Sequence, residues 1–265
     1  PTNTKKKTDA YMRIGDASFL SIENDGAVRN YQKALEMDEG FNDQALFYMA
    51  KTLGYMGRSS EKTSKLLSII DNYPNSRYLQ LSVFEVAETY KSEERYEMAK
   101  QYYQLLVNDY PSSNKVMDAK INIAFIYGKL KQYALSEQAY KEVMNVYGTD
   151  QKVCKDVANG LKDLYNDMGQ PEKVEGLPRL YPCFELDPTE QENLYYIPAI
   201  TAYTDSSVSQ TQRYRNAIPK FEKYLTKFPA GRYTNEVKHY LADCHYGLDN
   251  KVDAVTLALK NNLIV

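Results

Sequence analysis

Residues 73–111 read YPNSRYLQLSVFEVAETYKSEERYEMAKQYYQLLVNDYP. An aromatic–proline step stands at each end of this stretch, and Phe228-Pro229 repeats the step later in the chain. Each of these three prolines is followed by a small residue 13 positions on and by another 25 positions on; the pairs are Ala87 with Ala99, Ala124 with Ser136, and Ala242 with Ala254. The spacing predicts a repeated helical hairpin, so we expect stacked units rather than one closed globular core.

The repeated residues have a physical reason. Proline lacks an amide N–H and disfavours the α conformation at the residue before it, so each aromatic–proline step is expected to end the second helix of a pair. Small residues let two antiparallel helices approach to roughly 8–9 Å. We therefore expect Ala87 to face Ala99, with Val83 and Tyr103 among the larger residues packed around this contact.

The fold class expected is all-α: an α-α superhelix of about seven antiparallel helical hairpins. The helices are expected at 8–20, 25–37, 42–56, 59–72, 76–92, 95–109, 113–130, 133–147, 151–168, 171–177, 188–203, 215–227, 231–247 and 251–261. Pro219 is expected only in the first turn of its helix, because a proline in a helix interior removes a hydrogen bond. The pattern weakens from Gly148, which stands where a proline is expected, to Phe228.

Four segments follow from this pattern. We expect a flexible tail over 1–7, a first repeat block over 8–176 and an irregular connection over 177–187. A second block of about two pairs should occupy 188–265. The chain ends on an apolar run, Leu263 to Val265, which predicts either a continuation beyond it or self-association through that end.

Composition narrows the function classes. Thirty-three basic residues stand against 35 acidic ones, for a net charge of -2, and no basic stripe is present, so nucleic acid is not expected as a partner. The longest apolar run, Ala45 to Ala50, has six residues, so no transmembrane segment is expected. The chain begins at Pro1 without a methionine, which leaves an upstream signal peptide open.

No constellation of catalytic residues, metal ligands or cofactor-binding residues is recognisable. The cysteines, at 154, 183 and 244, are an odd and widely spaced set, which argues against both a disulfide framework and a zinc site. The histidines, His239 and His245, lie six apart on one expected helix and therefore point from different faces. We expect no enzyme activity, no cofactor and no metal.

The repeat resembles the tetratricopeptide repeat. The residues that fit its pattern are Tyr11, Ile14, Gly15, Ala27, Tyr31, Ala34, Ala87, Tyr90, Tyr96, Ala99, Tyr103, Pro111, Leu241, Ala242 and Ala254. Lys62 departs from it, because the pattern has a small residue there. Pro74 and Pro111 are 37 apart, against a common period of about 34, which predicts an added helical turn at the start of each first helix.

This longer form resembles the bacterial envelope branch of the family: outer-membrane assembly lipoproteins, periplasmic division-coordinating proteins and repeat proteins of the Bacteroidetes. The resemblance implies that the first helix of each pair lines a concave groove. The equivalent positions here are Phe47, Phe84, Ile121 and His239, with Lys51, Glu88, Phe125 and Asp243 one turn further on. Phe47, Phe84 and Ile121 are spaced by 37 residues. They either form a row of exposed apolar side chains that binds a peptide or helix, or belong to the core.

The function expected is therefore a non-enzymatic scaffold that binds a peptide or helical segment of a protein partner along this groove. The resemblance places it in the periplasm or at the outer membrane, with the cytoplasm left open. The alternative is a module that binds peptidoglycan or another polysaccharide, suggested by 25 tyrosines whose rings could stack on sugars.

Overall fold

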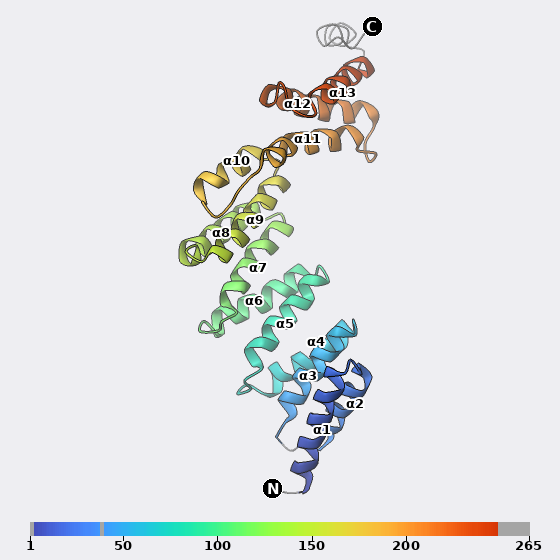
Figure 1. Cartoon of the computed structure of the whole chain (residues 1–265), viewed down its shortest axis with the longest axis vertical. Coiled ribbons are helices and arrows are strands. Elements are labelled where there is room, and N and C mark those ends of the chain that lie inside the picture. The colour runs from blue at the N-terminus through green and yellow to red at the C-terminus, as the bar shows by residue number, and fades with distance from the viewer. Residues whose placement is uncertain (1–2, 38–39, 249–265) are drawn as a thin grey trace. The chain divides into compact units, whose positions relative to one another are not determined.

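The computed structural model describes residues 3–37 and 40–248, and within them the chain folds into thirteen α-helices and no β-strand (Figure 1). The helices are α1 (Asn3–Leu20), α2 (Asn24–Glu36), α3 (Asn42–Tyr55), α4 (Ser59–Asn72), α5 (Leu79–Ser92), α6 (Tyr96–Asp109), α7 (Val116–Lys129), α8 (Tyr133–Tyr147), α9 (Gln151–Asp167), α10 (Pro171–Leu180), α11 (Pro188–Thr204), α12 (Gln210–Lys227) and α13 (Thr234–Gly247). The all-α class is confirmed. The helix expected at 251–261 and the run from Leu263 to Val265 lie outside the described residues.

The chain divides into two compact units, Pro1–Gly148 and Thr149–Val265. Unit 1 holds the hairpins α1–α2, α3–α4, α5–α6 and α7–α8, and each hairpin packs on the next one along the chain. Unit 2 holds the hairpins α9–α10 and α11–α12, followed by α13. The boundary follows Gly148, where the repeat pattern weakens, and so precedes the connection expected at 177–187.

The turns inside five of the six hairpins share one backbone device. One residue of each of these five turns has a positive φ angle: Ile22 (63°), Gly57 (72°), Glu94 (57°), Lys131 (59°) and Gly169 (65°). In the α5–α6 turn, the amide of Arg95 then donates to the carbonyl of Tyr90 over 2.9 Å, five residues back. This is the Schellman ending of a helix, and it reverses the chain within two residues so that the second helix can pack against the first.

The aromatic–proline steps end helices as expected. Tyr73, Tyr110 and Phe228 cap α4, α6 and α12 with nearly identical angles, φ of -129°, -130° and -128°. These angles lie outside the α region, which the following proline disfavours. The three steps therefore produce the same chain reversal in both units.

The extra residues of the long repeat are not the added helical turn that we expected. After Pro74 the chain makes two tight turns, with the amide of Ser76 donating to Tyr73 and that of Leu79 to Ser76. Helix α5 then begins at Leu79, and α7 begins in the same way at Val116, each three residues later than expected. Consecutive tight turns satisfy the backbone groups that proline leaves without an intrahelical partner.

Small residues form the contacts within hairpins. Ala87 and Ala99 are fully buried, and Ser136 donates its buried hydroxyl to the carbonyl of Ala124 over 2.7 Å. At Gly15 a Cβ atom would lie 2.6 Å from the ring of Tyr31, so glycine is required for this aromatic contact. The close approach inferred from the sequence is confirmed for Ala124 and Ser136 by the hydrogen bond between them.

Lys62 is accommodated by a second departure from the repeat. A Cβ at Gly54 would lie only 3.2 Å from the Lys62 side chain, so the missing side chain on α3 makes room for the lysine stem. The Lys62 ammonium reaches Glu85 of α5 over 2.7 Å. The lysine thus joins the second hairpin to the third instead of loosening its own.

Two expected irregular segments are partly helical. Helix α1 begins at Asn3, inside the expected tail 1–7, and Thr8 donates its hydroxyl to the carbonyl of Thr4 over 3.1 Å. Helix α10 continues to Leu180, inside the expected connection 177–187, and contains Pro178. Only the residues from Tyr181 to Asp187 form the connection.

Caps decide where the helices of unit 2 begin. Asp187 accepts hydrogen bonds from the amides of Thr189 and Glu190 over 2.8 and 2.9 Å, as the Asp-Pro pair at the start of α11 indicates. Helix α12 begins at Gln210 because Ser209 caps it, five residues earlier than expected. Pro219 therefore lies inside α12 and not in its first turn, and its ring lies on the exposed face.

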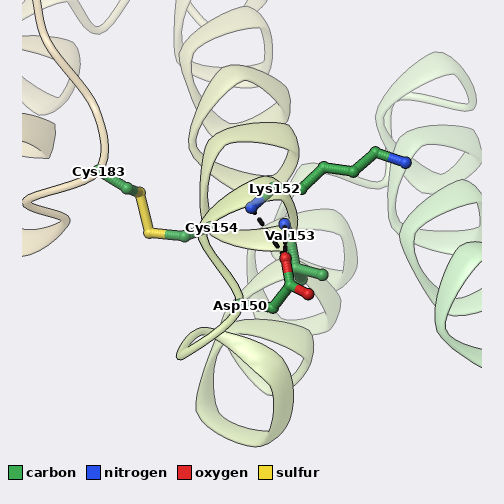
Figure 2. The surroundings of a disulfide bond; sticks show 5 residues. All are labelled: Asp150, Lys152, Val153, Cys154 and Cys183. Carbon is green, nitrogen blue, oxygen red and sulfur yellow. Dashed lines mark hydrogen bonds between the residues drawn. A yellow bond between two sulfur atoms is a disulfide. The ribbon is translucent and has the colours of Figure 1, made fainter.

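The expectation of unpaired cysteines is wrong for two of the three. Cys154 on α9 forms a disulfide with Cys183 of the 181–187 connection (Figure 2), their Cα atoms being 6.1 Å apart. Phe184 beside it is buried, 6 % exposed. The disulfide fixes the connection onto α9, whose first turn is capped by Asp150 (Figure 2). Cys244 is a free, buried thiol.

Candidate functional site

The apolar ladder expected at the groove is mostly core. Phe47 and Phe84 are 5 % and 8 % exposed, and Ile121 is half-buried. The Phe47 ring stacks on that of Tyr78 with centroids 4.6 Å apart, and Tyr78 belongs to the tight turns before α5. The ring of Phe84 meets that of Tyr103 edge-on. Phe47 therefore stabilises the stacking of one hairpin on the next, and Phe84 stabilises the packing of α5 on α6.

The positions one turn further on are more accessible. Lys51 is exposed, and Glu88 and Phe125 are half-buried. The Phe125 ring contacts Tyr96, and the Lys129 ammonium lies 5.3 Å from the centroid of the Phe125 ring. These residues come from α3, α5 and α7, the first helices of three consecutive hairpins. We call the surface that they form, together with Ile121, the unit 1 face.

A hydrogen-bonded network lies at the centre of the unit 1 face. Lys91 donates to both carboxylate oxygens of Glu88, over 2.9 and 2.8 Å, and to Oδ1 of Asn122 over 2.9 Å. Asn122 Nδ2 donates to Oε1 of Glu88 over 3.0 Å, and the Tyr103 hydroxyl donates to the same oxygen. Burial, followed by this bond to Glu88, raises the pKa of Tyr103 well above its ordinary value. The network holds Glu88 in one position and joins α5, α6 and α7.

The remaining candidates lie in unit 2 on α13. His239 and Asp243 are exposed, and Asp243 Oδ2 accepts hydrogen bonds from the hydroxyls of Tyr203 and Tyr214 over 2.6 and 3.0 Å. Burial, followed by the bond to Asp243, raises the pKa of Tyr203. Tyr196 on α11 donates in the same way to Glu236 over 3.0 Å.

These tyrosines were not identified as site residues from the sequence. The signal available was their shared spacing of seven, which places Tyr196 and Tyr203 on one face of a helix and Glu236 and Asp243 on one face of another.

A cleft of about 820 Å³ lies on the other side of α11, between it, the α9–α10 turn and α12. Its lining includes Pro198, which gives no amide donor to the carbonyl of Leu194, another lining residue. The charged lining groups have both signs, with Lys162 paired to Glu190 over 3.3 Å. The cleft marks incomplete packing between the two hairpins of unit 2.

Reactive chemistry has no recognisable centre in the described residues. No three His, Cys, Asp or Glu side chains gather there as a group that could hold a metal ion. Burial raises the pKa of the Cys244 thiol to about 12, so this cysteine is protonated and unreactive near neutral pH. None of the helices in the described part of the chain is long and apolar enough to cross a bilayer.

The architecture is that of a helical-hairpin repeat protein. Residues 44–76, 82–113 and 118–149 match the tetratricopeptide repeat family, which covers α3 to α8. The helices α3 to α8 are therefore tetratricopeptide repeats. No curated protein has a sequence that matches it.

Solved structures of the same fold cover most of the chain. A tetratricopeptide repeat protein from Parabacteroides merdae has a TM-score of 0.59 and 14 % identity, over 97 % of this chain and 93 % of that one. The MamA protein has a TM-score of 0.53 and 17 % identity, over 77 % and 99 %. Pseudomonas aeruginosa pilF has a TM-score of 0.50 and 14 % identity, over 90 % and 99 %. At these identities the likeness is one of fold.

Proposed function

We propose that this chain is a non-enzymatic scaffold that binds a peptide or helical segment of a protein partner on the unit 1 face. Tetratricopeptide repeats generally mediate protein–protein interactions, and three of them supply this face. The observation that carries the proposal is the Glu88 network. It fixes a charged group, with Phe125 and Lys51 at the same position of neighbouring repeats, before any partner arrives. A preorganised surface loses less side-chain entropy on binding.

The disulfide favours an oxidising cellular compartment for this protein. Disulfides form and persist in oxidising environments and are rare in the reducing cytosol. The Cys154–Cys183 bond joins α9 to a connection that contains one proline, Pro182, and has no regular structure of its own. We place the scaffold in the bacterial cell envelope, in the periplasm or at the outer membrane, as the resemblance of the long repeat to envelope proteins also suggests.

The partner-binding proposal is tested by capture from an envelope fraction of the source cells. Phe125→Ser, Lys51→Glu and Glu88→Gln alter the unit 1 face, whereas Ser64→Glu changes an exposed position on α4, a second helix of its hairpin. We expect the face variants to lose a captured protein that the wild type and Ser64→Glu retain. Circular dichroism should report the same helicity for all four.

One result would contradict this proposal, and another would change which variant tests it. Capture that is equal for the wild type and every face variant would show that the unit 1 face is not used. Unfolding of Phe125→Ser would assign Phe125 to the core, and the test would then rest on Lys51→Glu, whose side chain is exposed.

The compartment is tested by trapping thiols in intact cells before lysis. In an oxidising envelope only Cys244 should react with a maleimide after denaturation without reductant, giving one added label. Three added labels would mean that Cys154 and Cys183 are reduced in the cell, and the envelope assignment would fail.

A further inference from the structure

Apolar side chains gather at the turns of the first two hairpins. Leu20 and Ile22 at the α1–α2 turn are 81 % and 82 % exposed, and Tyr55 at the end of α3 is 72 % exposed. The half-buried ring of Phe19 connects them, since its centroid lies 5.4 Å from that of the Tyr55 ring. We call these four residues the turn patch. Exposed apolar side chains are ordinary when scattered singly, but a contiguous group marks a surface that contacts another molecule.

The fold does not require apolar residues at these positions. Five hairpin turns have the same backbone conformation, so their residues can be compared one by one. The residue with a positive φ is Ile22 in the first turn, and it is glycine, glutamate or lysine in the other four. Two positions earlier, the first two turns have an apolar residue, whereas the last three have polar ones: Ser92, Lys129 and Asp167. The turn therefore forms without an apolar side chain at either position.

Ile22 also has a steric penalty that a glycine would avoid. Its φ of 63° lies in the left-handed region, where a β-branched side chain is an outlier. Because the side chain is 82 % exposed, it gains little from packing against the described part of unit 1. A strained residue that the fold does not need is grounds for a functional hypothesis, since contacts outside the fold can then account for it.

The α1–α2 side of the turn patch is acidic. Glu23 and Asp25 follow Ile22 within three positions, both are exposed, and neither makes an ion pair among the described residues. The basic residue at the next turn, Arg58, donates to both carboxylate oxygens of Glu61 over 2.6 Å, so its charge is already paired. A molecule that covers this side is favoured by positive charge beside its apolar surface.

The α3 side of the turn patch has the opposite charge, because Lys51 is exposed and lies about one turn before Tyr55. The ligand charge that fits the patch is therefore one-sided, with cations along the edge that meets the α1–α2 turn. An amphipathic helix can provide this arrangement, since one face of it can be apolar while lysines or arginines follow one edge of that face.

Two other occupants fit the turn patch less well. An anionic membrane leaflet would meet two unpaired carboxylates, Glu23 and Asp25, and the single cation Lys51. A stable dimer interface contains roughly 20–30 residues on each side, and the turn patch is a group of four. A short helix needs only a small apolar area, because a few anchor side chains on one of its faces make the contact.

We propose that the turn patch binds an amphipathic helix of a protein partner. The apolar face of this helix lies on the turn patch, and lysine or arginine side chains along one edge pair with Glu23 and Asp25. Its apolar residues stand at positions i, i+3 or i+4, and i+7. The turn patch shares no residue with the unit 1 face, although Lys51 of that face lies beside it. It is a second binding surface, and the inference does not rest on the proposed function.

The test uses the full chain and a synthetic helical peptide with leucines at i, i+4, i+7 and i+11 and lysines along one edge. A single tryptophan in the peptide, a residue that the chain lacks, reports binding by fluorescence anisotropy. We expect saturable binding. Leu20→Ser and Ile22→Gly should each lower the affinity about tenfold, because each removes an apolar side chain that the complex buries.

Charge variants test the acidic edge of the turn patch. Glu23→Gln combined with Asp25→Asn should lower the affinity about threefold at low salt, and the difference from the wild type should disappear at high salt. A peptide whose lysines are replaced by glutamates should bind the wild type less tightly by at least the same factor, because like charges then meet at this edge.

Ile22→Gly also separates a binding role from a structural one. Glycine removes the penalty of the positive φ, so the thermal unfolding midpoint should rise by about 3 °C while the peptide affinity falls. A side chain that supports the fold would lower both. Val146→Ser, which changes a 65 % exposed side chain on α8, should leave both unchanged. Phe125→Ser alters only the unit 1 face and should leave the peptide affinity unchanged.

Five outcomes overturn the inference. Two concern the peptide: no saturable binding, or equal affinity for the wild type and the Leu20→Ser/Ile22→Gly double variant. A lower unfolding midpoint for Ile22→Gly would assign Ile22 to the fold. Binding to phosphatidylglycerol vesicles, or a dimer in sedimentation, that the double variant loses would assign the turn patch to lipid or to a second copy. The proposed function fails separately, when partner capture depends on none of Phe125, Lys51 and Glu88.

Discussion

The hairpins α5–α6 and α9–α10 are joined to the following helices by different forces. In unit 1 a single apolar cluster runs from α3 to α7, with Tyr103 and Leu106 of α6 and Ala119 and Ile126 of α7 all buried in it. In unit 2 the junction of α10 with α11 and α12 includes several polar contacts and leaves the 820 Å³ cleft open beside it.

The polar contacts at that junction are specific. Lys223 and Lys227 of α12 pair with Glu172 and Glu175 of α10, the second pair over 2.9 Å, and Tyr195 donates to Glu175 over 3.1 Å. The Cys154–Cys183 bond adds a covalent constraint. Where the small-residue spacing is regular, neighbouring hairpins are held together by burial of apolar side chains. Where this spacing is lost, a disulfide and surface ion pairs contribute to the packing instead.

The largest effect should come from the apolar region. Tyr103 is fully buried, so Tyr103→Ala should destabilise unit 1 by about 3–5 kcal/mol through the cavity that it leaves. Tyr103→Phe keeps the ring, removes only the bond to Glu88, and should cost about 1 kcal/mol. Urea unfolding followed by circular dichroism measures both. Equal effects of the two variants would mean that packing does not dominate here.

The cross-link comes next. The disulfide closes a loop with a sequence separation of 29, so Cys154→Ser with Cys183→Ser should destabilise unit 2 by about 3–4 kcal/mol. Hydrogen exchange measured by mass spectrometry should then show faster exchange in α9 to α11 and unchanged exchange in α5 and α6. If hydrogen exchange became faster to the same degree in both units, the proposed difference between their stabilising interactions would be wrong.

The hairpin turns allow a smaller and reciprocal test. Glu94 has a positive φ of 57° in the α5–α6 turn, whereas the α9–α10 turn has Gly169 at 65°. Glu94→Gly should stabilise unit 1 by about 1 kcal/mol, and Gly169→Ala should destabilise unit 2 by about the same amount, because only glycine adopts this conformation without a steric penalty. Thermal unfolding curves of the two variants should shift in opposite directions.

The smallest effect should come from the surface charges. Lys227 is 47 % exposed, so Lys227→Ala should cost unit 2 only about 0.5 kcal/mol, and high salt should remove the difference from wild type. A loss of several kcal/mol that is independent of salt would show that the junction depends on the lysine stem lying over Tyr195, 5.8 Å from its ring centroid, and not on the ion pair.

The backbone plan was largely predictable from local chemistry. Proline and the residue before it determine helix ends without reference to the rest of the fold, so the three aromatic–proline steps correctly predicted where α4, α6 and α12 end. Small residues at a fixed spacing identified a helix contact, as between Ala124 and Ser136. Caps were harder to predict, because a serine such as Ser209 is common in loops and signals a helix start only in context.

Side-chain partners far apart in sequence were not predictable. The period of 37 could not distinguish groove from core at Phe47, because that depends on Tyr78 folding over the ring from the next repeat. Nor could spacing pair Cys154 with Cys183, since which cysteines meet depends on where the connection after α10 returns. The space for Lys62, which departs from the repeat pattern, likewise depends on a residue of another helix, Gly54.

The disulfide also has a mechanical consequence. A chain pulled from its two ends lengthens as helices unravel, by up to about 3.6 Å for each residue released. The disulfide carries the force across the segment between its two cysteines, which have a sequence separation of 29. Roughly 100 Å of extended chain length is therefore not released until the bond is reduced. Under tension applied at the two ends of the chain, α10 and most of α9 would add no length while the hairpins of unit 1 extend.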